Sequence, residues 1–147
     1  MAVSPAQMKR PDVSENVQQI LDRRRTTGPQ EIASKAHSFA AALAKAQSMD
    51  HENKLTGKPG SNVAVVKKDI YKECKASPEF AKEWKATTEH MREAYEAMRE
   101  QPVLTDGGPK KVHLSPEALE KAMKLAELEK VIGHMEKAGA KPANPTA

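Results

Sequence analysis

The sequence predicts an all-α protein, a small bundle of about five mostly antiparallel helices, and three observations point to this fold class. Apolar residues recur at helical spacing through most of the 147 residues. Residues 77–79 and 115–117 both read Ser-Pro-Glu, where a hydroxyl cap, a first-turn proline and a carboxylate favour a helix start. Gly28-Pro29 separates two further periodic segments, as expected where one helix ends and the next begins.

The first helix is expected over residues 13–26. Asp12 and Glu15 have the spacing of a capping box, in which each side chain accepts a hydrogen bond from a free amide of the first turn. The apolar stripe that would face the core consists of Val13, Val17, Ile20 and Leu21.

The second helix is expected over residues 30–48 and the third over residues 62–76, with a loop over residues 50–62 before the third. Ser61 or Asn62 would cap the third helix. The narrow, mostly small stripe of the second helix permits close approach of a neighbour and consists of Ile32, Ala36, Phe39, Leu43 and Ala46. The stripe of the third helix consists of Val63, Val66, Ile70 and Cys74.

The fourth helix is expected over residues 78–100 and the fifth over residues 116–137. Between them, residues 102–114 are expected to form a short hairpin or a wider loop, because Asp-Gly-Gly separates two apolar segments and a proline follows. The chain would then be a single helical domain over residues 12–138. The two tails, expected to be disordered, are residues 1–11 and 139–147.

The core of this bundle is expected to be thin. Leu, Ile, Val and Phe make up only 23 of the 147 residues, and alanine, which buries little area, supplies much of the other apolar content. Such a core stabilises a domain only modestly. We therefore expect an oligomer or a protein partner to complete it.

Charge and cysteine content restrict the ligand class and the compartment. The 24 basic and 20 acidic residues give a net charge of +4, well short of the basic stripe of a nucleic-acid-binding protein. One cysteine excludes an intramolecular disulfide, no apolar run is long enough to span a membrane, and the N-terminal segment lacks the apolar centre of a cleavable signal. We expect a cytoplasmic protein, or one exported without a cleavable secretory signal.

The fourth helix carries a dense aromatic and methionine stripe in a chain that has only one tryptophan and two phenylalanines. Two interpretations stay open. The stripe packs against the protein's own helices, or it anchors a partner, because Trp, Tyr and Met are enriched in interface cores. The stripe consists of Phe80, Trp84, Met91, Tyr95 and Met98.

The last helix has two apolar faces, which one buried face cannot satisfy. We expect either a bend, or a first half that packs on the domain and a second half that meets a partner or a second copy of the chain. The first face consists of Leu119, Ala122, Met123 and Ala126. The second face, nearly opposite, consists of Leu125, Leu128, Ile132 and Met135, with Val131 beside it.

Three consecutive arginines, Arg23, Arg24 and Arg25, fall in the last turn of the expected first helix. Cations there stabilise the negative end of the helix dipole, which is one interpretation. The other is a contact to nucleic acid or another anion, which Lys67 and Lys68 would extend if the third helix lies nearby. No aromatic residue is interleaved with these basic residues to stack on a nucleotide.

Motifs for catalysis, metals and cofactors are weak. Residues 56–62, TGKPGSN, lack the spacing of a phosphate-binding loop. The five histidines are scattered and none pairs with Cys74 at a metal-ligand spacing, so we expect neither a metal nor a cofactor. Most acidic residues fall on polar helix faces, where a pKa has little reason to shift toward that of a catalytic group.

The leading hypothesis is a non-enzymatic protein-interaction module, such as an adaptor, a chaperone-like factor, a secreted effector or a structural component of a particle. The apolar faces of the fourth and last helices would make its contacts. Two alternatives remain: a helical nucleic-acid-binding protein that uses the basic N-terminal half, and a small helical enzyme with a site in a cleft.

Overall fold

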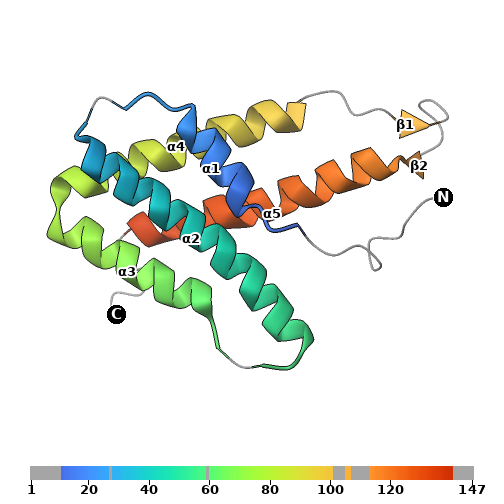
Figure 1. Cartoon of the computed structure of the whole chain (residues 1–147), viewed down its shortest axis with the longest axis horizontal. Helices are drawn as coiled ribbons and strands as arrows, with labels where there is room; N and C mark the ends of the chain where they lie inside the picture. The colour runs from blue at the N-terminus through green and yellow to red at the C-terminus, as the bar shows by residue number, and fades with distance from the viewer. Residues whose placement is uncertain (1–10, 27, 59, 101–104, 107–112, 141–147) are drawn as a thin grey trace.

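The computed structural model describes residues 11–26, 28–58, 60–100, 105–106 and 113–140. Within these residues five helices form one bundle, so the predicted all-α fold class is confirmed (Figure 1). Two short strands, β1 (Thr105–Asp106) and β2 (His113–Leu114), pair antiparallel inside the segment expected as a hairpin or loop. The helices are α1 (Ser14–Asp22), α2 (Gln30–Leu55), α3 (Asn62–Ala76), α4 (Pro78–Glu100) and α5 (Pro116–Gly139).

The helices pack around α2, which contacts each of the other four. α4 and α5 lie side by side and run in opposite directions, as do α2 and α3, while α1 packs on α2 and α4 (Figure 1). Residues of the N-terminal tail before residue 11 and of the C-terminal tail after residue 140 lie outside the described part of the chain.

Local sequence signals determine where α4 and α5 begin. The Ser77 hydroxyl oxygen accepts a hydrogen bond from the Phe80 amide at 3.2 Å, and that of Ser115 accepts one from the Ala118 amide at 3.1 Å. These bonds satisfy amides that have no partner within the helix. Both predicted Ser-Pro-Glu starts are therefore confirmed.

α2 is longer than predicted, and the loop expected over residues 50–62 is wrong for residues 50–55. Asp50, in the added part of α2, caps α3: its carboxylate oxygens accept hydrogen bonds from the amides of Asn62 at 2.7 Å and of Val63 at 2.9 Å. Burial alone would raise the pKa of Asp50, but these hydrogen bonds outweigh it and hold the pKa below its ordinary value. α2 stops before Gly57, whose φ of 75° is a left-handed conformation that favours glycine.

α1 is shorter than predicted and ends at Asp22, so the three arginines follow the helix instead of forming its last turn. The chain turns there because Arg24 reaches α4. Its guanidinium forms an ion pair with Glu83 and donates a hydrogen bond to the Thr87 hydroxyl at 3.4 Å. The side chains of the pair are only 12% and 11% exposed, so this contact joins α1 to α4 in a largely buried setting.

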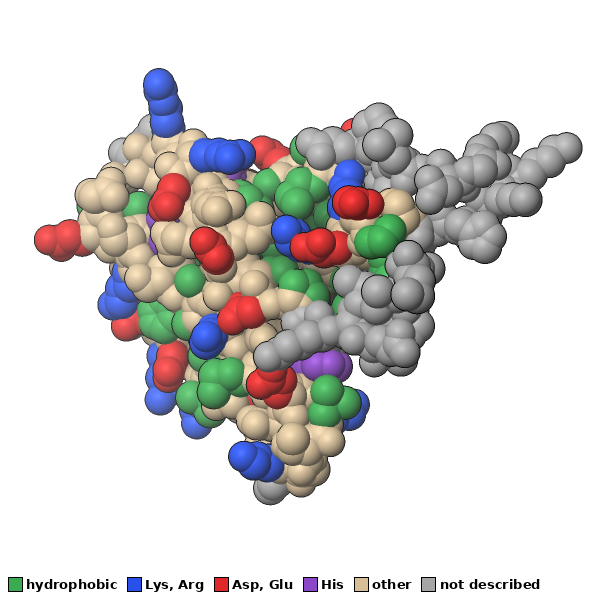
Figure 2. Space-filling view, turned by 45° about the vertical axis from the view of Figure 1, so that its right-hand side comes forward, with side chains coloured by type: hydrophobic (Ala, Val, Ile, Leu, Met, Phe, Trp, Pro, Cys, Tyr) green, Lys and Arg blue, Asp and Glu red, His purple; other side chains and the backbone are tan. Residues whose placement is uncertain are grey.

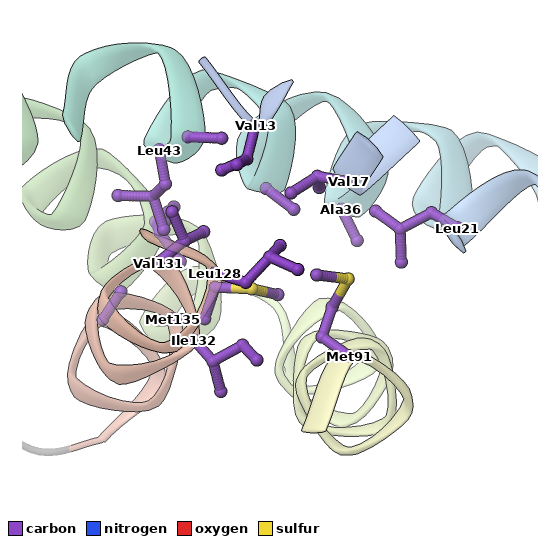
Figure 3. Close-up of a cluster of buried hydrophobic side chains, with 14 of the residues drawn as sticks. Val13, Val17, Leu21, Ala36, Leu43, Met91, Leu128, Val131, Ile132 and Met135 are labelled. Atoms are coloured by element: carbon purple, nitrogen blue, oxygen red, sulfur yellow. The ribbon is translucent and has the colours of Figure 1, made fainter. Parts of the chain in front are cut away.

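The core lies where α1, α2, α4 and α5 meet (Figure 3). The face of α2 that enters it is mostly alanine, which lets the neighbouring helices approach closely. Among the side chains labelled in Figure 3, the larger ones come from the other three helices and from Leu43, and they point toward one another: Val17, Leu21, Met91, Leu128, Val131, Ile132 and Met135. Phe80 and Trp84 of α4 and Ile70 of α3 belong to the same core.

His37 of α2 and His134 of α5 are half-buried histidines. His134 of α5 donates from Nε2 to the side-chain oxygen of Gln47 on α2 at 2.9 Å. Burial lowers the pKa of His134, and the charge of Lys67 lowers it further. Burial also lowers the pKa of His37 on α2, with a second contribution from the charge of Arg24.

Acid is therefore expected to destabilise the fold. A histidine whose pKa is lowered by folding contributes stability above its unfolded-state pKa of 6.5, and this contribution is lost as the pH falls below that value. The unfolding temperature should fall between about pH 7.5 and pH 5, before most carboxylates titrate. The double substitution His37→Gln and His134→Gln should flatten this fall in a thermal unfolding series. An equally steep fall in the double variant would contradict the prediction.

Candidate functional site

Trp84 is the centre of the candidate site, on the face of α4 that packs against α5. Its side chain is 1% exposed, and its ring stacks on that of Phe80 with centroids 6.0 Å apart. The indole N–H donates to the backbone carbonyl of Met135 at 2.9 Å. Because a buried indole N–H without an acceptor is costly, this bond favours one position of α5 on α4.

Gly139, the last residue of α5, lies against the edge of the same ring. A Cβ at this position would lie 2.6 Å from Trp84 Cδ1 and 3.0 Å from Trp84 Nε1. Side-chain carbons do not approach an aromatic ring so closely. Glycine is therefore what allows the end of α5 to lie on the indole.

A groove of about 650 Å³ lies beside this contact, between α4 and the C-terminal end of α5. We call it the α4/α5 groove. The Thr88 hydroxyl borders the groove. It donates a hydrogen bond to the Trp84 carbonyl of its own helix at 2.8 Å. The apolar lining consists of Ala81, Trp84, Met135, Gly139 and Ala140, and the charged lining consists of Lys82, Lys85, Glu89 and Glu136.

A smaller hollow of about 260 Å³ continues the groove along α4, since both are lined by Thr88, Glu89 and Glu136. Arg92 lines this hollow and forms an ion pair with Glu136 at 2.7 Å. Its guanidinium also lies over the Tyr95 ring, 5.7 Å from the ring centroid. The two hollows together follow α4 for about three helical turns.

The structure places the predicted partner-binding stripe of α4 in the core instead of on the surface. Phe80, Trp84, Met91 and Tyr95 are at most 6% exposed, and Met98 is half-buried. The protein's own helices cover them, which is the first of the two interpretations that the sequence left open. Of the stripe, only Trp84 also lines the groove.

The two faces of α5 are divided in the opposite way to the prediction. Leu128, Ile132 and Met135 are fully buried in this single chain, because α2, α3 and α4 all pack against α5. The first half of α5 instead extends past α2 and α3 in Figure 1. Its apolar face is half-buried at Leu119 and Met123 and exposed at Ala122 and Ala126, while Leu125 of the second face is half-buried.

The five predicted anion-contacting residues do not form one patch. Arg24 is engaged in the ion pair with α4, while Arg23 and Arg25 are exposed beside it. Lys67 is half-buried and Lys68 exposed on α3, which lies across α2 from α1 in Figure 1. On the face in Figure 2, acidic and basic side chains are interspersed.

Groups suited to metal or nucleophilic chemistry are dispersed over the described residues. No cluster of three or more His, Cys, Asp or Glu side chains that could hold a metal ion occurs among them. Cys74 is half-buried, and burial raises the pKa of its thiol, which keeps it a weak nucleophile. Burial likewise raises the pKa of the Tyr95 hydroxyl, which donates to Glu129 at 2.9 Å.

Sequence reasoning missed the groove. Glycine near a helix end, such as Gly139, is typical of a helix stop, and charged residues such as Lys82, Lys85 and Glu89 are typical of a solvated helix face. The available signal was the small size of Ala81, which lines the groove. A small residue beside two helices that pack side by side leaves space that a larger one would fill.

The chain matches no protein-family model, and comparisons with curated proteins and with solved structures also give no match. Among the described residues, none of the helices is both long and apolar enough to cross a membrane.

Replacement of Gly139 by alanine is expected to destabilise the protein by about 1–3 kcal/mol, because the added methyl group displaces the buried Trp84 ring. Gly133→Ala is the matched control on the same helix, since a Cβ there meets nothing within 4 Å. It should be neutral or stabilising by up to about 1 kcal/mol. Urea unfolding of both variants measures the difference, and equal effects would argue against the close contact.

Proposed function

We propose that the protein is a non-enzymatic interaction module that binds an amphipathic helix of a partner protein in the α4/α5 groove. The observation that supports this is the groove itself, which lies directly beside the only tryptophan of the chain. Its floor is formed by the buried Trp84 and Met135. Its accessible apolar residues are Ala81, Gly139 and Ala140, and charged side chains border it. A mostly apolar concavity with a few polar groups is the usual form of a binding site.

The shape of the groove favours a helix as its occupant. α4 and α5 are antiparallel neighbours, and a third helix packs into the groove between two such helices at an axial distance of about 8–10 Å. Partner helices bound in this way present apolar residues at positions i, i+3 or i+4, and i+7. A length of about three turns along α4 accommodates three such anchors.

The burial of the apolar stripes of α4 and α5 also favours the α4/α5 groove as the binding surface. The stripes of α4 and α5 that the sequence offered as partner anchors are largely occupied by intramolecular packing. The proposed nucleic-acid alternative would need its basic residues on one surface, whereas α1 and α3 hold them apart (Figure 1).

The test is a titration with a synthetic amphipathic helix of about 16 residues that carries a leucine stripe and no tryptophan. Trp84 then supplies the only tryptophan signal, directly at the groove. We expect saturable binding by fluorescence. Ala81→Glu should weaken it at least about tenfold, because this variant places a charge on the apolar wall.

Ala97→Glu is the matched control, since Ala97 is an exposed alanine of the same helix that lines neither hollow. It should bind the peptide as the unmodified protein does. Circular dichroism and thermal unfolding show that both variants fold. Absence of binding, or equal weakening by the two substitutions, would reject the proposed function.

A further inference from the structure

The charges along the α4/α5 groove are ordered, which constrains the partner more than the apolar wall does. Lys82 and Lys85 line the end of the groove near the start of α4. Going toward the end of α4, the groove and its continuation are lined by Glu89, Glu93 and Glu136, with Arg92 as the one cation among these residues. One end therefore has two positive charges and the other has a net negative charge.

The dipoles of α4 and α5 act in opposite directions on a helix bound between them. α5 ends at Gly139, so its C-terminal carbonyls, the negative end of its dipole, lie at the end of the groove that Lys82 and Lys85 border. A bound helix that places its N-terminus there runs antiparallel to α5 and parallel to α4. Its dipole then opposes that of α5, which is favourable, and is parallel to that of α4, which is unfavourable, so the side-chain charges decide the direction.

We infer that the partner segment is a helix with acidic side chains in its first turn and basic side chains in its last turn, bound parallel to α4. This inference rests on the proposed function and names the partner's charge order and direction. Acidic groups at the start face Lys82 and Lys85, and basic groups at the end face Glu89 and Glu93. The same order stabilises the partner helix by itself, because it complements its own dipole.

Two peptides of identical composition test the inference on the unmodified protein. One carries two glutamates in its first turn and two lysines in its last turn, and the second has these charges exchanged, with the same leucine stripe. At low salt the acid-first peptide should bind at least about tenfold more tightly than the base-first peptide by Trp84 fluorescence. The difference should shrink in about 0.5 M salt.

The double substitution Lys82→Glu and Lys85→Glu should reverse part of this preference. It should lower the affinity for the acid-first peptide about tenfold and raise the affinity for the base-first peptide, since the whole groove then carries negative charge. The matched control is Lys58→Glu with Lys68→Glu, which makes the same charge change at exposed lysines outside the groove. The control should leave the ratio of the two affinities unchanged.

Each outcome separates this inference from the proposed function. If both peptides bind the unmodified protein equally, the charge order is rejected while the groove remains a binding site. If neither binds, the proposed function itself fails. A further outcome is that sedimentation shows dimers of the unmodified protein that are absent in the variant Lys82→Glu with Lys85→Glu. That result would assign the groove to a second copy of the chain. NMR shifts of residues 141–147 caused by that variant without peptide would assign it to the chain's own tail. Either assignment would overturn the inference.

Discussion

The hydrogen bond from the Trp84 indole to the Met135 carbonyl is the constraint on which the fold and the candidate site both depend. It joins residues 51 positions apart and fixes the end of α5 against α4. Gly139 permits the indole to approach the helix backbone, and the ring of Phe80 stacks on the indole. The same contact lies beside the α4/α5 groove, which Trp84 and Met135 both line.

A thin core explains why polar contacts matter in this bundle. α2 presents mainly alanine to its neighbours, so each buried side chain of α2 removes little apolar area from water. Buried or half-buried polar contacts add specific connections between helices: Arg24 pairs with Glu83 between α1 and α4, and Asp50 caps α3 from α2. Such contacts set the positions of helices that small apolar side chains would otherwise leave loosely defined.

The parts of the fold that could be predicted are those controlled by neighbouring residues. Serine caps and helix propensity determine the starts of α3, α4 and α5, and the sequence alone shows them. The residues that follow α1, and residues 50–55 of α2, are placed by contacts of Arg24 and Asp50 with other helices, which no local pattern reveals. Helical periodicity correctly showed which face of α4 is apolar. It could not show whether that face meets the protein's own helices, nor that Gly139 would lie on Trp84.

The exchange of the single tryptophan indole proton with solvent tests the central contact most directly, because it gives one resolved NMR signal and needs no substitution. A proton that is hydrogen-bonded to Met135 and buried should exchange only when the protein opens widely, together with the most protected amides of α4 and α5. An indole proton that exchanges as fast as that of a free tryptophan side chain, while those amides stay protected, would contradict the proposed role of this contact.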